Sequence, residues 1–268
     1  SKGNFTDPML NIDKFGADAL RYYLMSGPVM QSEDIKFSDN EIKEIHGKII
    51  NILWNTFKFY DLYKQDYDGK TAAQDSDNPL DVWILARLSQ LANEVTDNLD
   101  KYNTVKASRP VKDFASDFST WYVRRSRERI KSADVDDKQF ALATMRYVLN
   151  ELSKLIAPIM PFMAESIYKG VGAGDKESVH LEEWAAFAKA TASQAQLAKD
   201  MEEVRKIVSL GLEARAKANI KVRQPLRKLK VQNSKFKLKE ELLKLIKDEL
   251  NVKEVVFDDK ILLGEVDL

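Results

Sequence analysis

Apolar residues return every three or four positions along most of this chain, which is the spacing of one buried face of an α-helix. The pattern predicts helices over residues 12–27, 38–64, 79–102, 105–131, 140–156 and 197–218. Polar connections separate the helices between residues 38 and 156, which is typical of antiparallel helices that pack side by side. The central part of the chain is therefore predicted to be a helical bundle.

Several of these helices carry recognisable boundary signals. Ser38 and Glu41 form the S-x-x-E pattern of a capping box, and Pro79 stands at a first helical position, where its missing N–H costs nothing. Asp136 is placed to cap the helix over 140–156. Pro110 is expected either to bend the helix that contains it or to delay the start of its regular part.

The pattern changes after Pro225. Residues 226–232 alternate apolar and polar side chains, residues 238–250 have helical spacing, and residues 252–257 are rich in strand-forming residues. A strand, a helix and a second strand within so short a stretch predict a small α/β unit.

These elements together predict a mainly α fold, an antiparallel helical bundle with a small C-terminal α/β appendage. We expect three parts: a leading segment with short elements, the bundle, and a helix followed by the α/β unit, at residues 1–37, 38–196 and 197–268. A stretch that is rich in alanine, residues 185–196, is expected to be a linker or an exposed helix start.

Composition narrows the class of protein. The 268 residues are 44% hydrophobic and 31% charged, as expected for a water-soluble domain with a substantial core. The chain lacks the run of roughly 18 apolar residues that a membrane-spanning helix needs, and its first residues do not resemble a signal peptide. It contains no cysteine, which suits a reducing cytoplasm and excludes disulfides and thiolate metal sites.

The sequence shows no set of residues that would make this chain a catalyst by itself. His46 and His180 are the only histidines, they lie far apart, and neither has a neighbouring motif, so both are interpreted as structural. The glycines over 170–174 follow no strand and precede no lysine at phosphate-loop spacing, which favours an ordinary surface loop. We expect no metal site and no catalytic residue here.

The net charge of zero conceals a strong asymmetry. Ten lysines and arginines and no acidic residue lie within 215–239, which leaves 32 basic and 42 acidic residues elsewhere, a net charge of −10. Such segregation indicates one surface for a polyanion on an otherwise acidic body. A solvated basic face is the simpler alternative.

Residues 119–131, STWYVRRSRERIK, form the second cationic stretch. At the helical angle of about 100° per residue, one side carries a stripe that changes from aromatic to cationic: Phe114, Phe118, Trp121, Arg125 and Arg129. A second row alongside it holds Arg124, Arg127 and Lys131. Cations beside aromatic side chains are what binding to phosphates and unpaired bases requires.

A structural interpretation of this helix is also open. Trp121 would then belong to the core, and Arg125 and Arg129 would pair with carboxylates such as Asp113 or Asp117. We expect Phe114 and Phe118 in the core, Trp121 at its edge, and the row at 124, 127 and 131 to be the more exposed one.

Several motifs in the same order resemble class Ia aminoacyl-tRNA synthetases. SKGN, DP and GADALRYYL, within residues 1–24, resemble the segment at the end of the K-M-S-K-S loop of that class. Further matches to its anticodon-binding helices are LWN, LDVWILARL, FSTWYVRRSRERI and LIAPIMPFMAESIY, over 53–55, 80–88, 118–130 and 155–168. ARAKANIKVRQPL, residues 214–226, resembles the isoleucine-specific branch.

The resemblance implies a C-terminal fragment that begins with Ser1 and Lys2, the remnant of the ATP-contacting loop. The catalytic domain and its H-I-G-H motif would lie upstream, so the parent would join isoleucine to its tRNA with ATP and Mg²⁺. This fragment would need no cofactor and should be inactive alone. Residues 1–37 would then lie near the stem-contact region, and the bundle over 38–196 would bind the anticodon arm.

We therefore expect a cytoplasmic monomer that binds tRNA. The tRNA-binding residues are predicted to be Trp121, Arg124, Arg125, Arg127, Lys131, Arg215, Lys217, Lys221, Arg223, Arg227 and Lys228. Two alternatives stay open: a valine-specific member of the same class, and a helical protein-interaction scaffold that does not bind tRNA.

Overall fold

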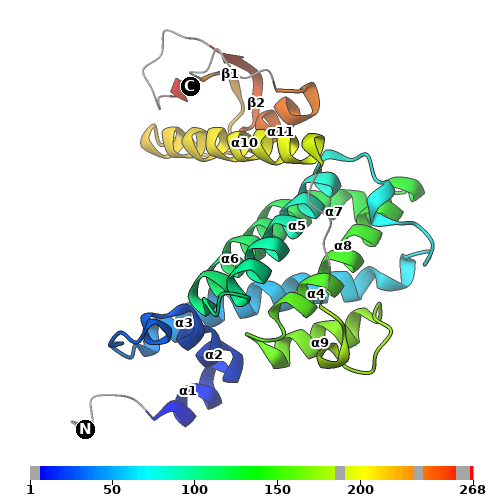
Figure 1. Ribbon diagram of the computed structural model, residues 1–268. Helices are drawn as coiled ribbons and strands as arrows, with labels where there is room; N and C mark the ends of the chain where they lie inside the picture. The colour runs from blue at the N-terminus through cyan, green and yellow to red at the C-terminus, as the bar shows by residue number, and fades with distance from the viewer. Residues whose placement is uncertain (1–6, 185–190, 232–237, 258–265, 268) are drawn as a thin grey trace. The chain divides into compact units, whose positions relative to one another are not determined.

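A computed structural model of the chain describes residues 7–184, 191–231, 238–257 and 266–267. The chain divides into two compact units, residues 1–190 and 191–268 (Figure 1). The first unit groups the leading segment with the bundle, and the second begins ahead of residue 197. None of the described helices is both long and apolar enough to cross a bilayer.

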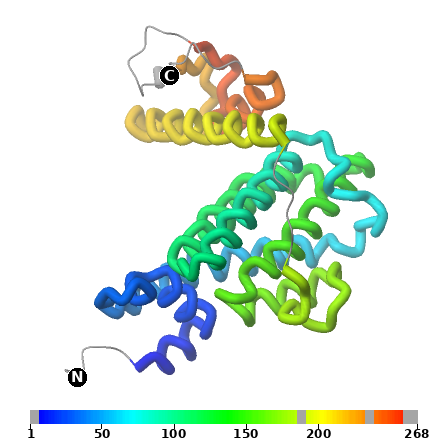
Figure 2. Tube along the Cα trace, viewed as in Figure 1, coloured from blue at the N-terminus to red at the C-terminus, as the bar shows by residue number. Residues whose placement is uncertain are grey.

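The described residues of the first unit form helices and their connections, without a strand. Its α-helices are α1 (Pro8–Phe15), α2 (Ala17–Ser26), α3 (Asp39–Ile45), α4 (Asn51–Tyr63), α5 (Pro79–Leu99), α6 (Thr104–Ser116), α7 (Arg124–Lys131), α8 (Val135–Ile156) and α9 (Pro161–Val171). Helices α5 and α6 run antiparallel and side by side, and α8 packs against α5, α7 and α9 (Figure 2). The mainly α bundle predicted from the apolar spacing is confirmed.

Helix starts show where local signals succeed and fail. Ser38 caps α3 by accepting the Glu41 N–H, but its own N–H donates to the Tyr23 hydroxyl, not to the glutamate of a capping box. Asp134 caps α8, not Asp136, so the helix begins at Val135. The apolar pattern missed this first turn because residues 135 and 136 are exposed and 137 and 138 are only partly buried, so the turn adds no buried apolar side chain.

Gly16 and Pro110 affect the helices differently from what the sequence predicted. The helix predicted over 12–27 is two helices, because Gly16 has a φ of +82° between them. Pro110 lies inside α6, which begins ahead of it at Thr104 with Asn103 as its cap. The predicted delay of this helix is therefore wrong.

Among the described residues, two π-helical turns interrupt the α-helical register. They cover His46–Ile50, between α3 and α4, and Asp117–Val123, between α6 and α7. A π-helical turn bonds each N–H to the carbonyl five residues back, so it contains more residues than an α-helical turn. The second of these turns makes α6 and α7 one continuous helix over 104–131 and changes which side chains face the core.

Helix α2 caps another helix. The Asp18 carboxylate accepts the backbone N–H groups of Met163 at 2.6 Å and Phe162 at 3.4 Å, in the first turn of α9. Met160 stands at the N-cap of α9 and provides no side-chain bond of its own. A carboxylate at this end also interacts favourably with the helix dipole, so Asp18 joins two segments far apart in sequence.

Two more side chains of α2 attach it to the bundle. Arg21 donates to the carbonyls of Pro158 at 2.9 Å and Ile159 at 3.2 Å, just ahead of α9. The buried Tyr22 hydroxyl donates to the Ser108 carbonyl in α6 at 3.1 Å. The leading segment is therefore part of the first unit.

Where the structure describes it, the second unit has a mixed sheet and two helices. Its elements are α10 (Ala192–Lys217), β1 (Leu226–Val231), α11 (Glu240–Leu250), β2 (Val252–Phe257) and β3 (Val266–Asp267). Strand β1 lies between β2, which is parallel to it with Leu226 opposite Val252, and β3, which is antiparallel. The α/β appendage is confirmed, and β3 is an addition to it.

Helix α10 begins earlier than its apolar pattern indicated. Thr191 and Gln194 form a reciprocal capping box that starts the helix at Ala192. Residues 192–196 are alanine-rich and largely exposed, so they add nothing to an apolar stripe. Of the segment predicted to be a linker or helix start, residues 185–190 lie outside the described part of the chain.

A close helix contact yields a stability prediction. A Cβ built on Gly170 of α9 would lie 2.2 Å from a ring carbon of the buried Phe57 in α4. Gly170→Ala should therefore destabilise the first unit by about 1–3 kcal/mol through overpacking. Gly47→Ala, at a helical position with open space around it, should be neutral or stabilise by up to ~1 kcal/mol. Urea unfolding of both variants measures the difference, and equal midpoints would contradict the contact.

Candidate nucleic-acid interface

The helix over 104–131 buries a row of aromatic rings. Phe114, Phe118 and Tyr122 stack in sequence, with ring centroids 6.0 and 5.8 Å apart. Tyr122 therefore continues the buried stripe, whereas Trp121 is only partly buried at its edge. The shift from the predicted stripe follows from the π-helical turn, in which positions four residues apart stay on one line.

Arg129 leaves this stripe to join two carboxylates. Its Nη1 and Nη2 donate to the two oxygens of Asp81 at 2.9 and 2.7 Å. Its Nε lies 2.9 Å from each oxygen of Asp137, and Nη2 lies 2.7 Å from one of them. One planar guanidinium thus connects the starts of α5 and α8 to α7, a geometry that lysine could not reproduce.

The buried end of this cluster is fully hydrogen-bonded. Asp81 is 0% exposed and also accepts the hydroxyls of Tyr122 and Ser76, both at 2.7 Å. Burial and the neighbouring Asp81 raise the pKa of Tyr122 well above its usual value. Burial opposes the charge of Arg129, but its bonds to Asp81 and Asp137 raise its pKa overall, and Arg129 lowers the pKa of Asp137.

The prediction that Arg129 pairs with carboxylates is therefore correct, but the predicted carboxylates are wrong. It pairs with Asp81 and Asp137, whereas Asp117 accepts a bond from Arg87 at 3.1 Å. Local spacing along one helix favoured Asp117, because carboxylates on other helices could not be placed from the sequence.

The second row is exposed, as expected. Arg124, Arg127 and Lys131 are solvent-exposed along α7, whereas Arg125 and Trp121 are partly buried. The Arg124 Nε donates to the Thr120 carbonyl at 2.7 Å, which orients its guanidinium along the helix. This exposed row is called the α7 cation row below.

A neighbouring aromatic pair was missed. The guanidinium carbon of Arg127 lies 5.6 Å from the ring centroid of Phe59 in α4, and that ring is 5.2 Å from the ring of Tyr63. Cation–π contacts of this kind orient a guanidinium while leaving its N–H groups in water. Phe59 and Tyr63 are four residues apart in α4, so the sequence could have shown them as a second aromatic stripe on that helix.

The second basic stretch lies at the end of α10, in the following turn and on β1. Lys217, Lys221, Arg223 and Arg227 are exposed, and Lys228 is partly buried. Carboxylates from outside the basic run reach two of them: Glu213 lies 2.9 Å from Lys217 and Glu254 lies 3.6 Å from Lys228. The structure therefore supplies acidic partners that a count within 215–239 overlooked. Residues 232–237 of that run lie outside the described part of the chain.

Arg215 requires a correction. It is 1% exposed, and its guanidinium donates to the carbonyls of Lys221, Gln224, Leu250 and Asn251 at 2.6–3.3 Å. Burial lowers the pKa of Arg215. A guanidinium enclosed in this way does not face a ligand, so the prediction that Arg215 contacts RNA is wrong.

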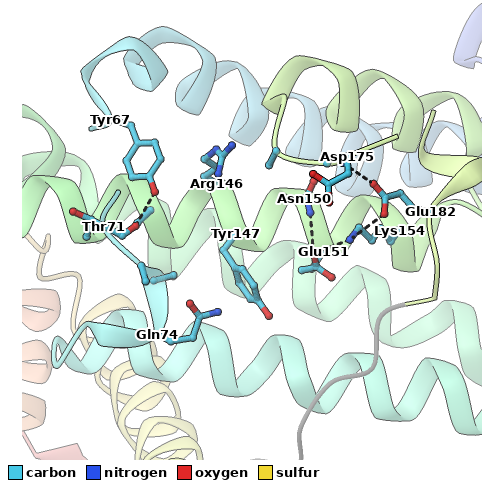
Figure 3. Close-up of a pocket in the computed structure, with 15 residues that line it drawn as sticks. Tyr67, Thr71, Gln74, Arg146, Tyr147, Asn150, Glu151, Lys154, Asp175 and Glu182 are labelled. Carbon is cyan, nitrogen blue, oxygen red and sulfur yellow. Dashed lines mark hydrogen bonds and ion pairs between the residues drawn. The ribbon is translucent and has the colours of Figure 1, made fainter. Parts of the chain in front are cut away.

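A polar cavity lies within the first unit. It has a volume of about 320 Å³ and is lined by residues of α8, the loop around Thr71 and the loop around Asp175. Figure 3 shows Lys154 between Glu151 and Glu182, with nitrogen–oxygen distances of 3.1 and 3.6 Å. Asn150 donates to Glu151, so the charged groups at this end satisfy one another and none is arranged as a nucleophile with a base.

Two further predictions concern the remnant of the ATP-contacting loop and metal binding. Ser1 and Lys2, the predicted loop remnant, lie outside the described residues. Within the described ranges, no group of three or more histidine, aspartate or glutamate side chains is arranged to hold a metal ion.

Comparison with known proteins gives a consistent family. The profile of the family described as "Anticodon-binding domain of tRNA ligase" matches residues 81–231. The chain is 36% identical, over an alignment 277 positions long, to an isoleucine–tRNA ligase of Treponema pallidum (strain Nichols). It is 39% identical to the isoleucine–tRNA ligases of Clostridium tetani over 267 residues and Clostridium acetobutylicum over 266. Each match covers 96% of this chain and 25% of the relative.

A solved structure was also matched, a ternary complex of Agrobacterium radiobacter K84 LeuRS with tRNA and LeuAMS. The TM-score is 0.49 at 18% identity, over 72% of this chain and 21% of that one.

The arginine cluster yields a prediction that separates structure from binding. Arg129→Met leaves the Asp81 carboxylate buried without its partner and should lower the free energy of unfolding by about 3–5 kcal/mol. Lys131→Met removes the same charge two residues away at an exposed position and should change it by less than ~0.5 kcal/mol. Urea denaturation gives both values. If Arg129→Met were as stable as Lys131→Met, the cluster would not stabilise the bundle.

Proposed function

The chain belongs to the family of anticodon-binding domains of tRNA ligases, and we propose that it is the tRNA-binding portion of an isoleucine–tRNA ligase. Its role would be to hold the anticodon arm and so place the distant acceptor end for aminoacylation. Isoleucine–tRNA ligases that are 35–39% identical to this chain over 96% of its length support the isoleucine assignment.

The observation that carries the proposal is the division of cations on α7. Arg129 forms ion pairs with Asp81 and Asp137, whereas the side chains of the α7 cation row are solvent-exposed on the same helix. Exposed arginines and lysines at this spacing suit the phosphates of an RNA backbone, which set the register of a complex without reading its sequence. The exposed cations Lys221, Arg223 and Arg227 would contribute further phosphate contacts in the second unit.

Unpaired bases need flat partners. Trp121 and Arg125 keep this predicted role only through the parts of their side chains that reach the surface, since both are partly buried. The Arg127 guanidinium beside Phe59 is a further flat surface on α7.

The chain spans about a quarter of the length of the curated relatives it matches. We infer that the ATP- and Mg²⁺-dependent joining of isoleucine to tRNA would belong to regions outside this match, in a cytoplasmic enzyme. We also propose that the chain itself is a monomer without a cofactor.

The proposal is tested by the salt dependence of tRNA binding. If about five phosphates are neutralised, a plot of log affinity against log salt concentration should fall with a slope of roughly −3 to −5. Fluorescence anisotropy with labelled, unmodified isoleucine tRNA and with an RNA hairpin of equal length provides the measurement. A protein-interaction scaffold would bind neither RNA, and binding that ignored salt would contradict the phosphate contacts.

The α7 cation row has its own prediction. Replacing Arg124, Arg127 and Lys131 together with alanine should flatten the slope by about one for each phosphate that is no longer neutralised, hence by two to three. A matched control replaces Lys14, Lys48 and Lys169, three exposed lysines on other elements, and should leave the slope nearly unchanged. Equal effects of the two triple variants would show that only overall charge matters.

A further inference from the structure

The basic turn that follows α10 has a defined conformation. Asn219 has a φ of +56°, and the N–H of Gln224 donates to the Lys221 carbonyl at 2.9 Å, which closes a β-turn with Val222 and Arg223 at its corners. Lys221, Val222 and Arg223 are all solvent-exposed.

The carbonyls of this turn point inward to two side chains. The Arg215 guanidinium donates to the carbonyls of Lys221 at 3.1 Å and Gln224 at 3.0 Å. The Asn251 side-chain amide donates to the carbonyl of Val222 at 3.0 Å. With its carbonyls directed into the protein, the turn is left with its cationic side chains on the outside.

Arg215 is anchored on its other side. Its Nη2 also donates to the carbonyls of Leu250 at 2.6 Å and Asn251 at 3.3 Å, at the C-terminal end of α11. The partial negative charge at the end of a helix stabilises a buried cation without a carboxylate. The same side chain therefore ties the turn to a helix that is itself packed against α10.

The exposed cations of the turn differ from their neighbours. Lys217 and Lys228 have carboxylate partners, whereas no ion pair of Lys221 or Arg223 occurs among residues 7–184, 191–231 and 238–257. Two exposed cations on one short turn, without an ion pair to any of those described residues, suit adjacent phosphates of a nucleic-acid strand.

We propose that Arg215 is a positioning residue that holds the turn over 218–225 as a preformed clamp for an RNA backbone, with Lys221 and Arg223 as the phosphate contacts. The proposal rests on the tRNA-binding function proposed above. Arg215 is buried and cannot touch RNA itself, so it acts by reducing the conformational entropy that the turn loses on binding.

Arg215→Lys tests this role at constant charge. One ammonium cannot serve four carbonyls in the fork geometry of a guanidinium, so the turn should loosen while the net charge stays the same. Salt-dependent anisotropy with unmodified isoleucine tRNA should show about a tenfold loss of affinity and a slope flattened by one to two. Lys221→Ala combined with Arg223→Ala should produce a loss of similar size.

A double-mutant cycle separates positioning from a general loss of structure. If Arg215 acts through the turn, Arg215→Lys added to Lys221→Ala and Arg223→Ala should cause almost no further loss of affinity. Full additivity of the two changes would overturn the proposal. Lys217→Ala, which removes an exposed cation outside the turn, is the matched control and should alter the slope by clearly less.

A second variant keeps the test valid if Arg215→Lys unfolds the second unit. Asn251 has a φ of +48°, which glycine tolerates, so Asn251→Gly removes only the bond to Val222. It should flatten the salt slope while thermal unfolding and the circular dichroism spectrum stay close to those of the unchanged chain. An unchanged slope in Asn251→Gly would overturn the proposal, provided that the unchanged chain binds tRNA. If the unchanged chain did not bind, the proposed function itself would fail.

Discussion

The bidentate pairing of Arg129 with Asp81, extended to Asp137, is the interaction on which the first unit depends. It joins the starts of α5 and α8 to the middle of the bundle, and Tyr122 and Ser76 complete the bonds of the buried carboxylate. Because a buried charge without a partner is so costly, the rotation of α7 about its axis has little freedom. That rotation places the α7 cation row in solvent.

The second unit also encloses a guanidinium, but its hydrogen-bond acceptors are backbone carbonyls. Arg215 is enclosed by four backbone carbonyls, where Arg129 is held by two carboxylates. In both units a guanidinium bound by several acceptors, partly buried in Arg129 and buried in Arg215, fixes the segment that displays exposed cations. The sequence places buried and exposed arginines in the same basic stretches, so charge alone does not distinguish their roles.

Much of the fold follows from local physics. The helices with long apolar stripes, such as those now seen as α4 and α5, were predictable because burial of one face imposes a repeat of about 3.6 residues. The change to alternation after Pro225 likewise predicted β1. The predicted helix boundaries were wrong where no buried apolar side chain marks them. These places are the first turn of α8, the alanine-rich start of α10, and the break at Gly16.

The sequence by itself determined the mainly α class, the α/β appendage, the two basic stretches and the resemblance to class Ia tRNA synthetases. Only the tertiary structure decided which arginines are available to a ligand. Arg129 and Arg215 find their partners 48 and up to 36 residues away, on segments whose proximity local spacing does not encode. The π-helical turn at Asp117–Val123 also shifted the buried stripe to Tyr122, because packing of the whole bundle decides where a helix departs from its regular period.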